Sequence, residues 1–314
     1  MSSTSISVRS LLRDDAGSGY PPGYVLARLR GRRVALTGVP QAPAAAGAGD
    51  ADEKIWRGFL EELAWLFQQM DERLREANAP LFGLFEMKTI VLCLRYASLD
   101  RVEAQRRVLE HSLLSAPLRD ILGQRRHVGA IVAALGGALG GLSRAFLDLD
   151  SRYFEAGLKG CEDALMRMYL ESIAETRLAP PTRHFLTRFT DLRNLMALYK
   201  HLRWELKGPV VLIHGGTIDV PEFREAVIND DRAALDALIV RAAGVGISAA
   251  GEIGVETRLL TALGGELKRA RRERGGEWLV PDYMWRAYVH ARNLAVLHNT
   301  AGLEPSAAAR EMIA

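Results

Sequence analysis

The sequence has few of the features that mark several large classes of protein. Only two cysteines occur, Cys93 and Cys161, and both lie in apolar segments with helical spacing. Two buried cysteines suit a reducing compartment and build neither a disulfide framework nor a cysteine-rich metal centre. The net charge is only +3, which argues against a dedicated nucleic-acid-binding protein, because such a protein carries a basic stripe.

Long uncharged apolar runs are also scarce. The longest extends from Val128 to Leu142, and its 15 residues include five glycines. A membrane-spanning helix needs about 20 apolar residues, so this run predicts a buried helix interrupted by glycine. The first 15 residues hold no basic region followed by an apolar core, so no signal peptide is expected. We therefore expect a soluble cytoplasmic protein that contacts a membrane only through a partner.

The sequence offers no recognisable set of catalytic or metal-binding residues. None of its seven histidines forms a His-x-x-x-His pair with an acidic residue nearby. Gly215 and Gly216 are followed by threonine, isoleucine and aspartate, so a tight turn is favoured over a phosphate-binding loop, which needs lysine. His214 and these glycines are similar to the oxyanion loop of α/β-hydrolases, but no Gly-x-Ser-x-Gly segment accompanies them. No catalytic residue, cofactor or metal is therefore predicted.

One long predicted helix in the middle of the chain organises what the sequence does contain. Apolar residues recur at steps of three and four from 182 to 206, which places them on one face of a helix. At its centre stand Asp191, leucine, Arg193, Asn194 and leucine, in that order. Polar side chains in a buried helix can hold neighbouring backbone by hydrogen bonds, so we expect Asp191 and Arg193 to anchor the helix rather than to catalyse a reaction.

The same short pattern occurs twice more. Each copy has a polar residue, any residue, a base, a small polar residue and a branched apolar residue. One copy begins at Glu86, 105 residues before Asp191, and the other begins at His290, 99 residues after it. A period of about 100 residues predicts three related helical units. The predicted structural motif consists of Glu86, Lys88, Asp191, Arg193, Asn194, His290, Arg292 and Asn293.

The sequence therefore predicts an all-α fold of three similar helical domains, with expected bounds of 1–117, 118–218 and 219–314. Only residues 210–219 resemble a strand, and an apolar loop is the alternative for them. Asp52 is expected to cap a helix, and Pro80 is expected to end the same helical region.

The segment at 268–274, KRARRER, is a basic stretch with a helical pattern. A solvent-exposed face or a contact with an acidic protein partner is the favoured interpretation. Contact with anionic lipid or nucleic acid is the alternative.

Taken together, these segments resemble the family of C-type subunits of rotary A/V-type ATPases, whose eukaryotic counterparts are the d-type subunits of V-type ATPases. Five segments carry the resemblance, in the same order along most of the chain. They are the basic helix YVLARLRGRR at 24–33, LDLDSRYFEAGLKG at 147–160, the group at 191–195, the turn at 211–218 and the closing Ala-Arg-Asn-Leu at 291–294.

The resemblance implies a funnel of three helical domains with pseudo-threefold symmetry. It implies a non-catalytic subunit, one copy per complex, that sits on the cytoplasmic end of the membrane rotor ring and seats the central shaft. Its partners would be the central-shaft subunits and the ring, with no nucleic acid, and it would pass torque between them for ion transport. This chain departs from the family pattern at Thr89, which replaces an asparagine, and at His290, which replaces an acidic residue. The alternative function is a free-standing helical-repeat scaffold that binds protein partners.

Overall fold

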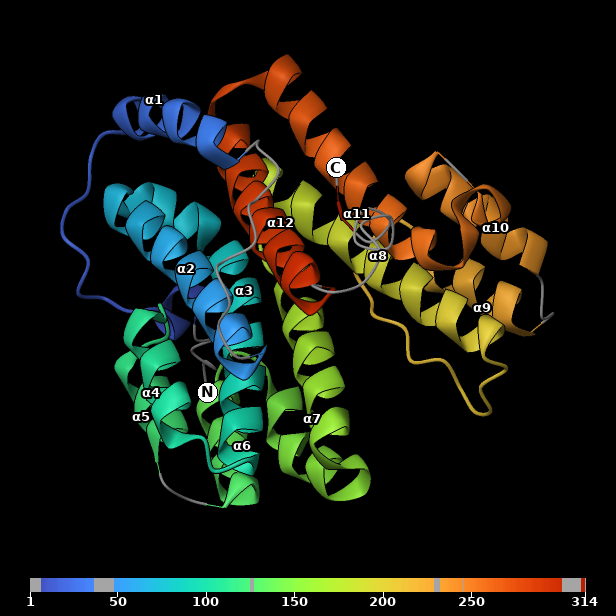
Figure 1. The fold of residues 1–314 in the computed structure, drawn as a ribbon, viewed down its shortest axis with the longest axis horizontal. Coiled ribbons are helices and arrows are strands. Elements are labelled where there is room, and N and C mark those ends of the chain that lie inside the picture. The colour runs from blue at the N-terminus through green and yellow to red at the C-terminus, as the bar shows by residue number, and fades with distance from the viewer. Residues whose placement is uncertain are drawn as a thin grey trace. The chain divides into compact units, whose positions relative to one another are not determined.

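The computed structural model of this chain is almost entirely helical (Figure 1). It describes residues 7–36, 48–124, 127–228, 232–244, 246–300 and 312–313. Helix accounts for 80% of the structure, and the described residues contain no strand, so the all-α prediction is confirmed. Residues 210–219, the candidate strand, form a loop.

The α-helices, in chain order, are α1 (Pro22–Arg33), α2 (Ala48–Gln69), α3 (Glu72–Ser98), α4 (Val102–His111), α5 (Ala116–Gly123), α6 (Val128–Leu139), α7 (Leu149–Ala174), α8 (Pro180–Arg203), α9 (Val220–Ile228), α10 (Arg232–Ala243), α11 (Ile247–Arg274) and α12 (Leu279–Asn299). The described residues also form short 3-10 helices, namely η1 (Val8–Leu11), η2 (Val34–Leu36), η3 (Arg144–Asp148) and η4 (Gly276–Trp278).

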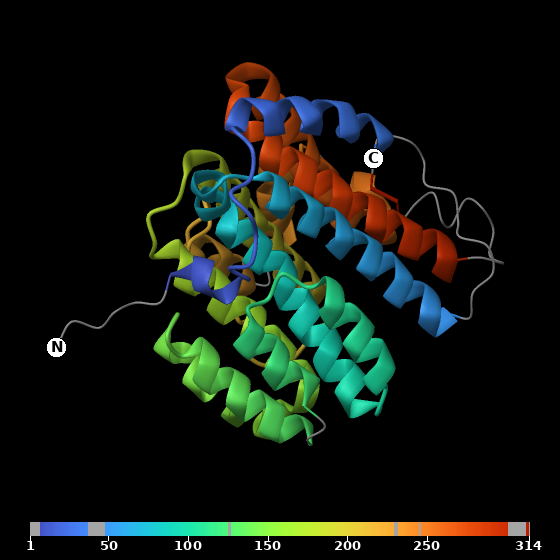
Figure 2. The same ribbon diagram turned by 90° about the vertical axis from the view of Figure 1, so that its left-hand side faces the viewer.

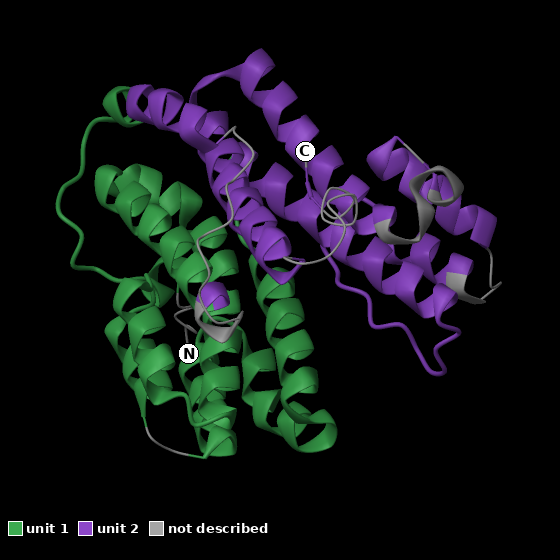
Figure 3. Cartoon of the chain, viewed as in Figure 1, with its two compact units in different colours: residues 1–25, 53–179 green, residues 26–52, 180–314 purple. Residues whose placement is uncertain are grey.

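The chain divides into two compact units, coloured separately in Figure 3. The first comprises residues 1–25 and 53–179, and the second comprises residues 26–52 and 180–314. The first unit contains the Glu86 copy of the repeated motif, and the second contains the copies at Asp191 and His290. The division into three domains around these copies stays a prediction.

Helix α3 forms the centre of the first unit, where it packs against α4, α6 and α7 (Figures 1 and 2). Every residue from 78 to 87 is buried, so this segment of the helix is covered on all sides. By length and composition α3 could cross a membrane, but 78% of its apolar window is buried inside the unit. Its rings of Phe82 and Phe85 lie 5.2 Å from those of Phe67 and Phe59 of α2, measured between centroids. These edge-to-face contacts hold α2 on α3.

Two expectations about the ends of helices α2 and α3 are wrong. Asp52 lies inside α2, which already begins at Ala48. Pro80 lies inside α3, and the break between the two helices falls ten residues earlier. There the Asp71 side chain caps α3 by accepting a hydrogen bond of 2.9 Å from the backbone N–H of Leu74. A local cap therefore decides the boundary, and burial of the following segment keeps proline within the helix.

A glycine divides the exposed start of α7 from its buried end. Gly157 has φ of +65°, which interrupts the helix. Phe154, before the interruption, is 78% exposed, whereas Cys161, Leu165 and Tyr169 after it are fully buried. The segment at 147–160 that carries part of the family resemblance thus lies mainly on the surface of the first unit.

Helix α8 holds the second unit together. It packs against α9, α10, α11 and α12, all of which belong to that unit. The ring of Phe185 on α8 meets that of Trp285 on α12 at 5.8 Å between centroids, and both residues are buried. The helix that the sequence predicts at 182–206 is therefore present at Pro180–Arg203, with its apolar side facing the core.

Replacing Gly83 with alanine should destabilise the first unit by about 1–3 kcal/mol through overpacking. A methyl group there would lie 2.2 Å from the hydroxyl oxygen of Tyr169. That side chain is fully buried, and its hydroxyl donates a 2.8 Å hydrogen bond to the Pro80 carbonyl, so it has little freedom to move. Urea unfolding monitored by circular dichroism measures the effect.

Gly58 of α2 supplies the matched control, because a methyl group there meets nothing within 4 Å. Alanine at position 58 is expected to raise the free energy of unfolding by about 0.5–1 kcal/mol through helix propensity. Equal effects of the two substitutions would contradict the packing of α7 on α3.

Candidate functional site

The middle copy of the motif holds a later turn against α8. One carboxylate oxygen of Asp191, Oδ1, accepts hydrogen bonds from the backbone N–H groups of Thr217, at 2.9 Å, and Ile218, at 3.0 Å. The other, Oδ2, accepts the Thr217 hydroxyl. Asp191 is only 1% exposed, although the turn lies 26 and 27 residues further along the chain. We call this contact the carboxylate anchor.

The glycine pair in the turn makes this contact possible. A Cβ atom at Gly216 would lie 2.1 Å from Oδ1 of Asp191, so only glycine lets the turn approach the carboxylate. Gly215 has φ of +92°, a conformation that other residues rarely adopt. The two amides that follow the glycines donate to Asp191. The turn therefore binds a carboxylate of its own chain with the groups that a phosphate-binding loop would direct at phosphate.

Asn194 makes a second contact from the same helix face. Its side-chain amide donates to the carbonyl of Ile213 and accepts from the N–H of Ile213, and both hydrogen bonds are 2.8 Å. Residues three apart on a helix are neighbours, so Asn194 and Asp191 hold the two ends of one loop. We call this two-way contact the amide anchor.

The first copy of the motif repeats the carboxylate anchor. Glu86 of α3 is fully buried, and its carboxylate accepts from the N–H of Leu113 at 2.6 Å and the hydroxyl of Ser112 at 2.7 Å. The separations along the chain are again 26 and 27 residues. Both partners of the anchor are thus displaced by the same 105 residues between the two copies. At the amide position, Thr89 instead accepts a 3.3 Å hydrogen bond from the indole N–H of Trp56.

The third copy repeats the amide anchor. Asn293 of α12 donates to the carbonyl of Ile313 at 2.8 Å and accepts from its N–H at 2.9 Å, across 20 residues. The corresponding separation in the middle copy is 19 residues. His290 occupies the carboxylate position, and its Nδ1 atom is buried without a hydrogen-bond partner among the described residues. Burial lowers the pKa of His290, which favours the neutral imidazole.

The bases of the motif lie outside the anchors. Lys88 is exposed, and its ammonium lies 4.3 Å from the centroid of the Trp56 ring. Arg193 is exposed, so the anchoring expected of this residue is made by Asp191 and Asn194. Arg292 pairs with Glu256 at 3.1 Å. In the motif, the polar pair therefore faces the interior and the base faces outward. The motif does not bring reactive side chains together at one position.

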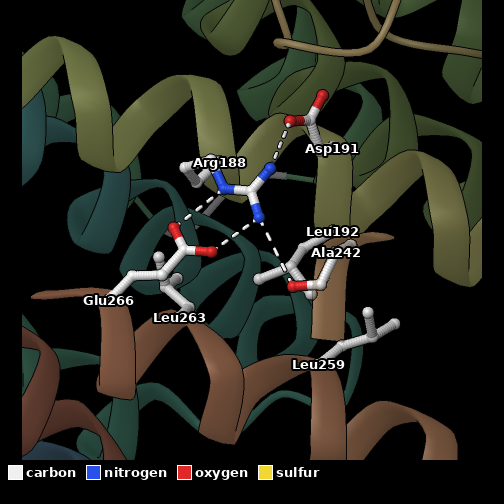
Figure 4. A pocket seen from close by; sticks show the side chains of 7 residues that line it. All are labelled: Arg188, Asp191, Leu192, Ala242, Leu259, Leu263 and Glu266. Atoms are coloured by element: carbon white, nitrogen blue, oxygen red, sulfur yellow. Dashed lines mark hydrogen bonds and ion pairs between the residues drawn. The ribbon is translucent and has the colours of Figure 1, made fainter. Parts of the chain in front are cut away.

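Sequence reasoning missed a partly buried arginine beside the carboxylate anchor (Figure 4). The guanidinium of Arg188 forms two hydrogen bonds with Glu266, at 2.9 and 2.7 Å, and a third, at 3.4 Å, with Oδ2 of Asp191. Burial would lower the pKa of Arg188, but the contacts with Glu266 and Asp191 hold it above its ordinary value. Arg188 lies three residues before Asp191, a helical spacing from which their ion pair could have been predicted. Glu266 lies 78 residues away on α11, and nothing in the sequence indicates its contact with Arg188.

This cluster borders the small hollow shown in Figure 4, which Leu192, Ala242, Leu259 and Leu263 also line. The hollow has room for about one water molecule. Small-molecule sites usually enclose several hundred Å³. The cluster is therefore best understood as an ion-pair contact that joins α8 to α11.

Other reactive groups are also buried. Burial raises the pKa of Cys161 to about 12 and raises that of Cys93 as well, so neither thiol forms a thiolate readily. Within the described ranges, no three histidine, cysteine, aspartate or glutamate side chains are arranged to hold a metal ion.

Neither protein-family models nor curated proteins give a match to this chain. The repeated motif and its contacts are therefore the observations that bear on its function.

Replacing Asn194 with leucine should lower the free energy of unfolding by about 2–4 kcal/mol. The change leaves the N–H and carbonyl of Ile213 without their partners, and each unsatisfied buried group costs about 1–3 kcal/mol. Asn293→Leu should have a similar effect through Ile313. Arg193→Gln, at an exposed neighbouring position, should change stability by less than about 0.5 kcal/mol. Urea unfolding measures the effects. If all three variants have the same free energy of unfolding as the wild-type protein, the amide anchor is contradicted.

Stability should depend on the ionisation of Glu86. Burial raises the pKa of this carboxyl above its ordinary value of 4.5, although the hydrogen bonds from Leu113 and Ser112 act the other way. The folded state then binds the proton more tightly than the unfolded chain. The resulting stabilisation is fully present below the unfolded pKa and is lost as the pH rises through the folded pKa.

Glu86→Gln removes this titration, so the variant should lose less stability than the wild-type protein between pH 4 and pH 8. Glu76→Gln, at an exposed position of the same helix, changes the net charge equally and serves as the control. The free energy of unfolding measured against pH tests the difference. Parallel curves for all three proteins would show that Glu86 has no raised pKa.

Proposed function

We propose that this protein is a non-catalytic central-stalk subunit of a V/A-type rotary ATPase. It links the central-shaft subunits to the membrane rotor ring and transmits torque for ion transport. It contacts the membrane only through the ring. The proposal begins from the ordered resemblance of five sequence segments to the family of C-type subunits.

The recurrence of the anchors is the observation that carries the proposal. Glu86 and Asp191 each accept from a hydroxyl 26 residues later and from a backbone amide 27 residues later. Asn194 and Asn293 each hold an isoleucine backbone about 20 residues later. Two unrelated helices have no reason to share such separations. The contacts therefore favour repeated helical units, which is the architecture that the resemblance implies.

The chemistry of the anchors suits a mechanical role. A subunit that passes torque must keep its helices and loops in fixed relation under load. Short buried hydrogen bonds of this kind, like the 2.6 Å bond from Leu113 to Glu86, hold a loop in one register on its helix. Close packing of a buried helical segment such as 78–87 of α3 transmits displacement rather than absorbing it. Such a subunit needs broad contacts, on the order of 1,000 Å² or more with each partner.

Removing this protein should uncouple ATP hydrolysis from ion transport. Without a link between shaft and ring, the soluble head should still hydrolyse ATP, but hydrolysis should drive no ion movement. ATP-driven transport in reconstituted vesicles and phosphate release from the same sample measure the two activities. Re-addition of the wild-type chain should restore transport, and Gly58→Ala, which meets no neighbouring atom, should restore it equally. Full transport by complexes shown to lack this protein would refute the proposal.

Affinity purification in mild detergent separates this function from the helical-repeat scaffold. A coupling subunit should bring down shaft and ring subunits together, with one copy of this chain per complex. A scaffold would bring down a changing set of client proteins and no ring subunits.

A further inference from the structure

A buried carboxylate at the start of α12 gathers three arginines. Asp282 is 1% exposed. Its Oδ2 atom lies 3.1 Å from Nε of Arg271 on α11 and 3.5 Å from Nε of Arg33, the last residue of α1. Its Oδ1 atom lies 3.2 Å from Nε of Arg286, one turn further along α12. All four residues belong to the second unit.

The charges in this cluster do not balance. Three guanidinium groups face one carboxylate, which leaves a surplus of two positive charges. Burial lowers the pKa of Arg33, and repulsion by Arg286, Arg271 and Arg272 lowers it further against the attraction of Asp282. The negative charge of Asp282 therefore does not balance the three arginines. The cluster is partly buried, so Coulomb interactions within it are stronger than in water.

Hydrogen bonding in the cluster is also incomplete. Arg286 donates one hydrogen bond to Oδ1 of Asp282. The Nε groups of Arg33 and Arg271 face Oδ2 of Asp282 at ion-pair distance, but these buried atoms form no hydrogen bond among the described residues. A guanidinium has five N–H donors, whereas one carboxylate offers about four acceptor positions. The donors of three arginines therefore exceed what Asp282 alone can satisfy, which leaves N–H groups of the guanidinium ends for a further acceptor.

Solvent reaches the three arginines only in part. Their side chains are 19%, 21% and 22% exposed, in the order Arg33, Arg271 and Arg286. A partner from solvent must therefore be compact, or be a small group that projects from a larger molecule. It must also carry more than one negative charge to balance the surplus.

We propose that Arg33, Arg271 and Arg286 form a binding site for a phosphate-type oxyanion, supplied either as free phosphate or pyrophosphate or as the phosphate of a lipid headgroup. A phosphate group is compact, carries nearly two charges at neutral pH as a monoester, and matches the two-pronged donor geometry of guanidinium. Asp282 fixes the three side chains in place and leaves their remaining donors for the anion. No step of the proposed role in a rotary ATPase uses this site, although a lipid phosphate bound here would add a direct membrane contact to the one made through the ring.

Titration of the full chain with pyrophosphate by isothermal calorimetry tests the site. The wild-type protein should bind, and Arg271→Gln should weaken binding about tenfold, as expected for loss of a hydrogen-bonded charge. Arg269→Gln provides the matched control, because it removes the same charge from an exposed position two residues earlier on α11. If Arg271→Gln does not fold, Arg271→Lys keeps the charge but removes the two-pronged geometry and should also weaken binding.

Vesicle flotation distinguishes the two sources of phosphate. Binding to phosphatidic acid vesicles but not to phosphatidylcholine vesicles, lost in the Arg271 variants, assigns the site to lipid. Pyrophosphate binding without vesicle binding assigns it to the free anion. Equal affinities of the Arg271→Gln and Arg269→Gln proteins would overturn the proposal, and so would binding of neither probe by the wild-type protein. Binding of an acidic peptide alone would overturn it as well and would identify a protein partner.

Discussion

Each copy of the motif has a buried polar side chain that reaches from a long helix to the backbone of a later loop. A loop amide that leaves water needs a partner, since an unsatisfied buried group costs about 1–3 kcal/mol. Asp191 satisfies two amides of one turn, and Glu86 satisfies one amide and a hydroxyl. The loop can therefore pack on the helix only in the register that makes these bonds, and this requirement places glycine at 216.

The three copies show how this requirement can be met in different ways. The middle copy keeps both anchors, the first keeps the carboxylate anchor, and the third keeps the amide anchor. Where an anchor is missing, another residue occupies the position, as Thr89 does with Trp56. His290 is half-buried, and burial lowers its pKa, which favours the neutral imidazole over a charge at this position. The motif is thus a structural element, and a function must be sought on the surfaces that the anchored helices present.

Much of the fold and part of the site could be predicted from the sequence. Apolar periodicity predicts α8 and α12 because their buried faces obey the helical repeat. Asp191, Asn194 and Asn293 could be found because the motif recurs. Periodicity fails in the middle of α3, since the segment 78–87 is buried on all sides and has no polar face. Pro80 then suggests a helix end there, which packing overrides. Arg188 with Glu266 and the arginines around Asp282 join distant segments, and such pairs leave no local signal.

The central claim is that the anchors of the three motif copies hold later loops on the helices. Residue-resolved amide hydrogen exchange tests this claim most directly. The amides of Leu113, Ile213, Thr217, Ile218 and Ile313 lie outside helices and donate to the side chains of the motif. If the anchors hold, these five amides exchange as slowly as the amides of the helices they are bound to, and Asn194→Leu releases the amide of Ile213. Exchange of all five at the rate of an unprotected loop in the folded protein would contradict the account.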